Sequence, residues 1–198
     1  MRRMHQEQED VFYYLTVMNE NYEHPEMPAG AAPDIIKGMY LFKKGNAGNA
    51  PRVQLLGSGT IFREVIAAAD LLRKDWDVES DLWGCPSFNE LARDGEDVAR
   101  WNMLHPTDPQ RVSHVESKLG ATSGPVVAAT DYIKLYAEQI RPFINKRFIA
   151  LGTNGFGRSD TREHLRNFFE VDRHWVTVAA LKALADEGAI GRDKGAAA

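Results

Sequence analysis

The chain has 198 residues, of which 43% are hydrophobic, so it can form one domain with a real core and short attachments. Its 24 basic and 28 acidic residues give a net charge of −4 without any block of like charge, so we expect no nucleic-acid partner. No apolar run reaches the roughly 18–20 residues of a membrane span, and the polar start MRRMHQEQED is not a signal peptide, so we expect no membrane association.

The first predicted element is a strand that lacks partners in this chain. Val11–Val17 (VFYYLTV) is a continuous apolar and aromatic run, typical of a strand that is buried on both faces. The polar segment after it contains prolines at intervals and is typical of a linker. We therefore assign residues 1–22 to the end of an upstream domain, 23–34 to a linker, 35–190 to one α/β domain and 191–198 to a flexible tail. Deleting residues 1–23 is expected to leave the thermal midpoint of that domain nearly unchanged.

Short apolar runs along the chain predict a single sheet. Four of them are expected to be parallel strands: Val53–Leu56, Ser80–Gly84, Pro125–Ala129 and Arg147–Leu151. A further run, Gly38–Lys43, is expected to be the antiparallel edge strand. The loop KGNAGNAP separates it from Val53–Leu56, which suggests a β-hairpin between the two.

Helical spacing and capping signals predict helices between these strands. The expected helical segments are Ile61–Leu72, a helix opened by Ser87 and Glu90, Val115–Leu119, Ile133–Ile140, and Arg173–Glu187 with Gly188 as its C-terminal cap. Asp94–Gly95 is expected to end or bend the second of them. Strands that alternate with helices predict a three-layer α/β/α fold with a mainly parallel sheet and one antiparallel edge strand.

A glycine-rich turn after the last strand is the first candidate site. Gly152, Gly155 and Gly157 suit a tight turn with unusual backbone angles. Asp160 precedes Glu163 by three positions, a capping-box spacing that opens a helix. Because helix N-termini bind anions, this turn and the earlier LGSGT could hold a small molecule. Neither matches a dinucleotide or P-loop motif, and the Asp160 carboxylate would compete with a phosphate, so we prefer turn geometry and capping as the explanation.

The histidines and the cysteine form no recognisable site. His105 and His114 flank an irregular segment without ligand spacing, so no metal site is predicted. Cys85 lies just before the helix that Ser87 caps, which could lower its pKa, but we prefer the interpretation that its thiol fills an apolar gap. A single cysteine also excludes an internal disulfide framework and favours the cytoplasm. We predict no catalytic, cofactor-binding or metal-binding residues.

Several stretches of the sequence are similar to one enzyme family. They are DVFYYLTVMNENY, QLLGSG, SFNELARDG, RWNMLHP, ATDYIKLYAEQIR and LGTNGFGRSDTREHLRNFFEVD, and they keep the family's order from about Val11 to about Gly188. They closely resemble the homodimeric type of the pyruvate dehydrogenase decarboxylating component, a thiamine diphosphate enzyme related to transketolase. The resemblance concerns only the last part of that larger enzyme, the end of its middle domain and its C-terminal domain.

The resemblance implies a function for the whole enzyme. That enzyme decarboxylates pyruvate on thiamine diphosphate with Mg²⁺ and reductively acetylates a lipoyl group; its partners are a second subunit of a homodimer and the acyltransferase component of the complex. The family's Gly-Asp-Gly…Asn stretch is absent here, its activating glutamate precedes this chain, and Asn154 stands where relatives commonly have aspartate. The chain is therefore expected to be a non-catalytic C-terminal domain that supports the dimer and its neighbouring domains and is inactive alone. The alternative is a small-molecule-sensing or subunit-docking α/β domain.

Overall fold

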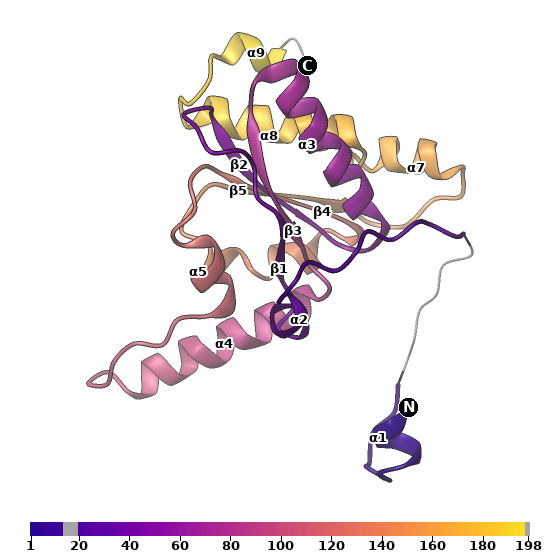
Figure 1. Cartoon of the computed structure of the whole chain (residues 1–198), viewed down its shortest axis with the longest axis vertical. Helices are drawn as coiled ribbons and strands as arrows, with labels where there is room; N and C mark the ends of the chain where they lie inside the picture. Colours follow the sequence, from indigo (N-terminus) through magenta and orange to yellow (C-terminus); the bar gives the residue numbers. More distant parts are fainter. Residues whose placement is uncertain (14–19, 197–198) are drawn as a thin grey trace.

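The computed structural model describes residues 1–13 and 20–196 and contains a sheet with helices on both faces (Figure 1). In the described residues the strands are β1 Tyr40–Lys43, β2 Arg52–Gly57, β3 Glu79–Gly84, β4 Val126–Ile133 and β5 Phe148–Thr153, in the order β1-β3-β2-β4-β5. Strands β2 to β5 run parallel, and β1 pairs antiparallel with β3 at one edge. The predicted sheet is confirmed.

The predicted hairpin between Gly38–Lys43 and Val53–Leu56 is wrong. β1 pairs with β3, with Tyr40 opposite Gly84, and β2 lies between β3 and β4. The burial of the strands explains this order. β2 is buried along nearly its whole length, as a central parallel strand must be, whereas alternate residues of β1 are exposed, which suits an edge.

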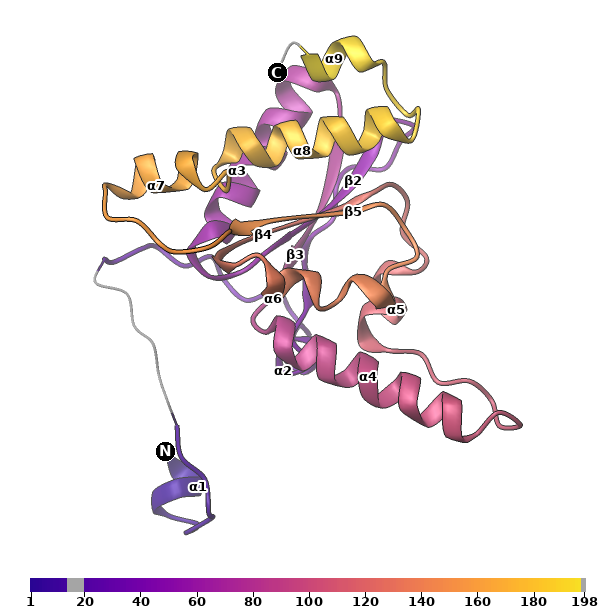
Figure 2. The same cartoon turned by 180° about the vertical axis from the view of Figure 1, so that it is seen from behind.

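The helices form the two outer layers. In the described residues they are α1 Arg2–His5, α2 Ala32–Ile36, α3 Phe62–Trp76, α4 Phe88–Leu104, α5 His114–Leu119, α6 Leu135–Glu138, α7 Arg162–Phe168, α8 Arg173–Asp186 and α9 Arg192–Ala196, with 3₁₀ turns η1 Gly59–Ile61 and η2 Arg141–Phe143. Helices α3 and α8 cover one face of the sheet, and α4, α5 and α6 cover the other (Figures 1 and 2). Val65 and Leu72 of α3 belong to the first core; Leu91 of α4 and Leu119 of α5 belong to the second. The predicted three layers are confirmed.

Helix α4 continues through Asp94–Gly95, so the end or bend predicted there is wrong. Its start is as predicted, because the Ser87 hydroxyl accepts the Glu90 N–H at 3.1 Å. Gly95 serves packing, since a Cβ at this position would lie 2.3 Å from the ring of Phe143 in η2. The missing side chain lets the helix backbone approach η2 closely, and the helix tolerates the glycine for that reason.

The helix predicted for Ile133–Ile140 is much shorter than expected. β4 extends to Ile133, which pairs with Thr153 of β5. This pairing keeps the chain extended, so α6 has only four residues before the chain turns into η2. Ala137 and Ile140 are buried as expected, but the Ile133 side chain is exposed because it lies on the strand.

Helix α7 begins one residue later than the sequence predicts. Thr161, not Asp160, is its N-cap residue, and the Thr161 hydroxyl accepts the His164 N–H at 3.4 Å. Asp160 instead accepts the Thr161 N–H at 2.7 Å. The cap predicted after α8 is confirmed, since Gly188 has a φ of +73° directly beyond the helix end.

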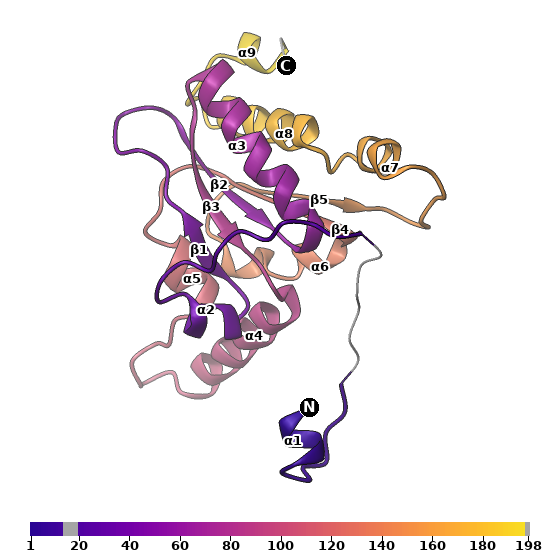
Figure 3. The ribbon, with the colours of Figure 1, turned by 45° about the vertical axis from the view of Figure 1, so that its right-hand side comes forward.

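The ends of the chain complete the description. Part of the strand predicted at Val11–Val17 lies outside the described residues, and residues 11–13 have no regular secondary structure. Helix α9 occupies Arg192–Ala196 within the predicted tail. After Glu20 the chain passes the start of α3 on its way to α2 (Figure 3). Among the described residues, none of the helices has the length and apolar character needed to cross a bilayer.

Candidate functional site

The carboxyl ends of β2 and β4 are the natural place for a site in this sheet. The chain leaves β2 toward β3 on one side and later returns to β4 on the other, so the strand order reverses between them. In open α/β sheets, ligands bind at such a reversal. Here the Ser58 hydroxyl donates to Thr130 Oγ1 at 2.7 Å, and the Thr60 hydroxyl donates to Asp131 Oδ2 at 3.3 Å. These bonds bridge the two strand ends.

A cavity of about 270 Å³ lies beside this bridge, next to α7. Its apolar wall is formed by Ile61, Leu165, Phe169 and Val171. The other lining residues are Thr60, Asp131, Thr153, Gly157, Arg158, Arg162 and Arg166. An apolar wall with a few convergent polar groups is the usual composition of a small-molecule pocket, and this volume is near the lower end of the usual range.

Three arginines around this cavity are the feature that the sequence interpretation missed. Arg158, Arg162 and Arg166 are spaced by four residues, which places the last two on one face of α7. That spacing is readable in the sequence. Nothing in the sequence shows, however, that this face of the helix lines a cavity, because the opposite wall comes from η1 and β4.

A second hollow of about 740 Å³ borders α7 as well. Residues of α3, α7 and α8 line it, together with Glu20 and Tyr22 from the segment before α2. Arg162 and Arg166 line both hollows. Helix α7 is therefore the wall that the two hollows share.

Glu64 on α3 is the buried centre of an ion network in the larger hollow. Its side chain is 8% exposed, and its carboxylate accepts the Nε–H of Arg173 at 2.9 Å and a guanidinium N–H of Arg166 at 3.2 Å. The backbone N–H of Arg173 also donates to it, at 3.2 Å. Burial raises the pKa of Glu64, but the hydrogen bonds and charge of Arg173, with the charge of Arg166, outweigh it and leave the pKa below its ordinary value. One carboxylate thus joins α3, α7 and α8.

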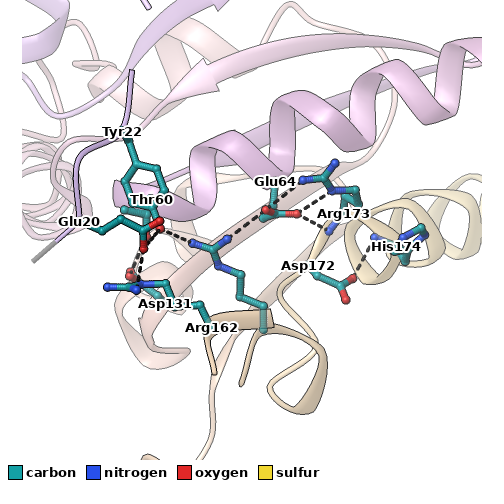
Figure 4. Close-up of polar contacts among 10 residues, drawn as sticks. Glu20, Tyr22, Thr60, Glu64, Asp131, Arg162, Asp172, Arg173 and His174 are labelled. Atoms are coloured by element: carbon teal, nitrogen blue, oxygen red, sulfur yellow. Dashed lines mark hydrogen bonds and ion pairs between the residues drawn. The ribbon is translucent and has the colours of Figure 1, made fainter. Parts of the chain in front are cut away.

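The segment before α2 contacts the same helices (Figure 4). Glu20 Oε2 lies 2.6 Å from Arg162 Nη1. The Tyr22 hydroxyl donates to Glu20 Oε2 at 3.1 Å and accepts an N–H from Arg166 at 3.4 Å. The Arg63 guanidinium lies over the Tyr22 ring, with Cζ 4.4 Å from the ring centroid. These contacts hold the segment against α3 and α7.

Close packing shapes the glycine turn after β5. A Cβ on Gly152 would lie 2.8 Å from the Lys134 Cα, and Gly155 has a φ of +70°. Gly152 and Asn154 border a hollow of about 230 Å³ together with Lys134 and Glu170. Gly152 therefore lies within β5 and not in the predicted turn, and close packing accounts for it; turn geometry accounts for Gly155, and Gly157 lies at the wall of the arginine-lined cavity.

Cys85, His105 and His114 each have a structural role. Cys85 is 2% exposed and burial raises the pKa of its thiol, which favours the apolar-gap interpretation over a reactive thiolate. His114 is buried, with Nε2 2.8 Å from the Met39 carbonyl oxygen. His105 Nδ1 lies 2.8 Å from the Trp101 carbonyl oxygen, and the two rings stack. In the part of the chain that the structure describes, no three side chains of the metal-binding types are grouped so as to hold an ion.

Comparison with known proteins accounts for this fold. Residues 38–172 match the family model described as the transketolase-like TK C-terminal domain. The chain belongs to this family. A transketolase from Pichia stipitis, crystallised with sedoheptulose 7-phosphate, superposes on the transketolase-like chain with a TM-score of 0.53 at 15% identity, over 83% of this chain and 20% of that one. At that identity the likeness shows the shared fold alone.

Two bacterial proteins are much more similar in sequence to this transketolase-like chain, and both are named pyruvate dehydrogenase E1 component. The one from Cupriavidus necator is 74% identical over 195 residues, which is 98% of this chain. The one from Pseudomonas aeruginosa is 61% identical over 190 residues, or 96% of this chain. The chain spans 22% of the length of each. Residues 1–25 match the model described as the pyruvate dehydrogenase E1 component middle domain. The expected resemblance is confirmed.

Proposed function

We propose that this chain is the last part of a pyruvate dehydrogenase E1 component that decarboxylates pyruvate on thiamine diphosphate and reductively acetylates a lipoyl group. The observation that carries the proposal is the 74% identity to the E1 component of Cupriavidus necator over 98% of the chain. The domain boundaries proposed are the end of the middle domain at residues 1–22, a linker at 23–34, the C-terminal domain at 35–190 and a tail at 191–198.

We expect no site for thiamine diphosphate and Mg²⁺ among the described residues. Mg²⁺ takes oxygen ligands in octahedral geometry, commonly one or two carboxylates with water and phosphate. Asp131 is the acidic residue that lines the arginine-rich cavity, and its carboxylate already accepts the Thr60 hydroxyl. We infer that the cofactor is held by the domains that precede this one in the E1 component.

The role of this domain in the enzyme is support of the homodimer and of the neighbouring domains. Exposed apolar side chains around α6 favour such a role. Ile133, Leu135 and Tyr136 are 41%, 65% and 39% exposed, and they line a hollow of about 530 Å³ with residues of α4. Contiguous exposed apolar surface of this kind marks protein contacts. The enzyme is proposed to act in the cytoplasm with the acyltransferase component as its partner.

A domain exchange tests this function. The matched 195 residues of the Cupriavidus necator E1 component are replaced by this chain. At this identity the packing against the rest of the enzyme is expected to be kept, so the chimera is expected to decarboxylate pyruvate at a rate comparable with the parent. The parent truncated before the exchanged region is the control and is expected to be inactive. A chimera that is folded and dimeric but inactive contradicts the proposal.

The isolated chain provides the complementary test. It is expected neither to bind thiamine diphosphate with Mg²⁺ nor to decarboxylate pyruvate. Calorimetric titration measures the binding, with the active chimera as the positive control. A micromolar dissociation constant for the isolated chain would show that the active site extends into this domain.

Small-molecule sensing is the second candidate function. The observation that favours it is the cavity of about 270 Å³, where Arg158, Arg162 and Arg166 meet an apolar wall. Guanidinium groups beside apolar surface suit a small organic anion. An NMR titration with pyruvate or inorganic phosphate tests it: saturable shifts confined to the cavity residues support sensing, and unchanged spectra at millimolar ligand argue against it.

A further inference from the structure

Glu20 and Tyr22 lie near the end of the part that matches the middle domain, residues 1–25, and the match to the C-terminal domain begins later, at residue 38. We propose that these two residues form a clasp that fixes the upstream domain against α3 and α7. The clasp consists of Glu20 and Tyr22 with their partners Arg63, Arg162 and Arg166. The inference rests on the proposed function, because it requires a domain before residue 20.

The clasp is attached to a buried support. Arg166 donates both to Glu64 and to the Tyr22 hydroxyl, so it links the segment to the network that joins α3, α7 and α8. The side chains of Glu64 and Arg166 are 8% and 19% exposed, whereas Glu20 and Arg162 are 44% and 42% exposed. The buried pair of Glu64 and Arg166 therefore holds Arg166 in place. The exposed contact of Glu20 with Arg162 can break and form again while Arg166 keeps its position.

The contacts define the orientation of the segment as well as its position. The helices present three guanidinium groups, and the segment presents a carboxylate and an aromatic ring. A guanidinium–carboxylate pair and a guanidinium over a ring face are both directional interactions. Glu20 pairs with Arg162 of α7, and the ring of Tyr22 contacts Arg63 of α3, so the segment is held at two points on different helices.

The clasp determines on which side of this domain the chain connects to the upstream domain. The segment lies beside the start of α3 and beside α7, at the carboxyl end of the sheet (Figures 3 and 4). Arg162 and Arg166 also line the cavity at that end. The cavity is thus next to the joint between the two domains, and the middle domain is held on this side of the sheet.

Distances between spin labels in the full chain test the clasp without any activity measurement. One label is placed at Asn21→Cys, exposed between the two clasp residues, and the other at Lys74→Cys, exposed on α3. Native Cys85 is 2% exposed and is expected to remain unlabelled. The distance distribution is expected to be narrow at low salt and to broaden at about 1 M salt, because exposed ion pairs are screened there.

Charge variants separate the clasp from general electrostatics. The released fraction is the share of molecules whose label distance lies outside the narrow peak. Glu20→Lys is expected to raise this fraction roughly fivefold at low salt, which is the size of effect that an exposed ion pair can have. Tyr22→Ala is expected to act in the same direction. Glu23→Lys makes the same charge change on an exposed neighbour and is expected to leave the distribution narrow. The exchange of charges in Glu20→Arg with Arg162→Glu is expected to restore a narrow distribution.

The clasp is contradicted if Glu20→Lys and Glu23→Lys give the same distribution, or if salt does not change it. Neither result depends on catalysis. An inactive domain-exchange enzyme together with a narrow, salt-sensitive distribution would refute the enzyme assignment and leave only the contacts of Glu20 and Tyr22 with the helices in place. An active enzyme together with a broad distribution would refute the clasp and leave the enzyme assignment in place.

Discussion

At the residue scale, the buried carboxylate of Glu64 sets the positions of two arginines from different helices. A buried ion pair stabilises little in net terms, because both charges lose hydration, but removal of one member leaves the others without compensation. Arg166 and Arg173 would then lie close together near the start of α3 with no acidic partner between them. The network therefore matters mainly for how the three helices are placed.

Glu64→Gln is expected to lower the free energy of unfolding by about 1–2 kcal/mol, less than for a fully buried pair because Arg173 is about half exposed. Urea denaturation measures it. Asp70→Asn is the control on the same helix: its pair with Arg73 is exposed on both sides, so a change below about 0.5 kcal/mol is expected. Equal effects of the two substitutions would contradict the central role of Glu64.

The same carboxylate predicts a pH dependence. The folded pKa of Glu64 is lowered from an ordinary value of 4.5, so its contribution is fully present above about pH 4.5 and is lost as the pH falls through the folded pKa. The stability difference between the wild type and Glu64→Gln is therefore expected to shrink in acid. Denaturation curves from neutral pH down to about pH 3 measure this. A difference that grows on acidification would have the wrong sign.

At the scale of the elements, Gly95 shows how a helix and a 3₁₀ turn constrain each other. Glycine in a helix interior is unfavourable relative to alanine by about 1 kcal/mol, so α4 is a weaker helix at this point than it could be. The space is needed because the Phe143 ring lies where a side chain would be. The packing of α4 against η2 thus requires glycine at position 95, which helix propensity alone would disfavour.

Gly95→Ala is expected to destabilise the domain by about 1–3 kcal/mol, because overpacking outweighs the gain in helix propensity. The background Phe143→Ala provides the control: there the ring atoms nearest to the added methyl are absent, so Gly95→Ala is expected to stabilise relative to that background. Thermal and urea unfolding of the four proteins give both values. A stabilising Gly95→Ala in the wild type would show that α4 does not pack against Phe143 in this way.

At the scale of the whole molecule, the segment at residues 1–22, which we propose as the end of the middle domain, differs along its length in what it contacts. In the part of the chain that the structure describes, the hydrogen bonds and ion pairs of residues 1–13 connect these residues with one another. Glu20 and Tyr22, by contrast, contact α3 and α7. The expectation that residues 1–23 can be removed at no cost is therefore replaced by a sharper one.

Deletion of residues 1–19 is expected to leave the thermal midpoint unchanged. Deletion of residues 1–23 is expected to lower the midpoint by about 2–4 °C, which corresponds to about 1 kcal/mol of stability in a domain of this size. Calorimetry on the three chains measures this. Both deletions are expected to reduce light scattering from self-association, because Phe12 is 83% exposed. Equal midpoints for all three chains would show that the clasp adds no stability.

The sequence by itself determined the strands, the direction of four of them and the layers around them. Runs such as Val53–Leu56 and Pro125–Ala129 are mainly apolar, and they form the central strands β2 and β4, which are buried on both faces of the parallel sheet. The helix caps were predictable for a local reason, because Ser87 and Gly188 act within one turn of the helix ends that they cap. The family resemblance likewise depended on the order of short motifs, which the chain carries directly.

Only the tertiary structure decided which elements share an edge or a wall. The partner of β1 depends on which strand edges are already occupied, and the length of β4 depends on its pairing with β5. The arginine-lined cavity and the Glu64 network join residues that are about a hundred positions apart, such as Glu64 and Arg166. No local pattern encodes such a meeting, because it results from the packing of α8 beside α3 on one face of the sheet, with α7 next to them.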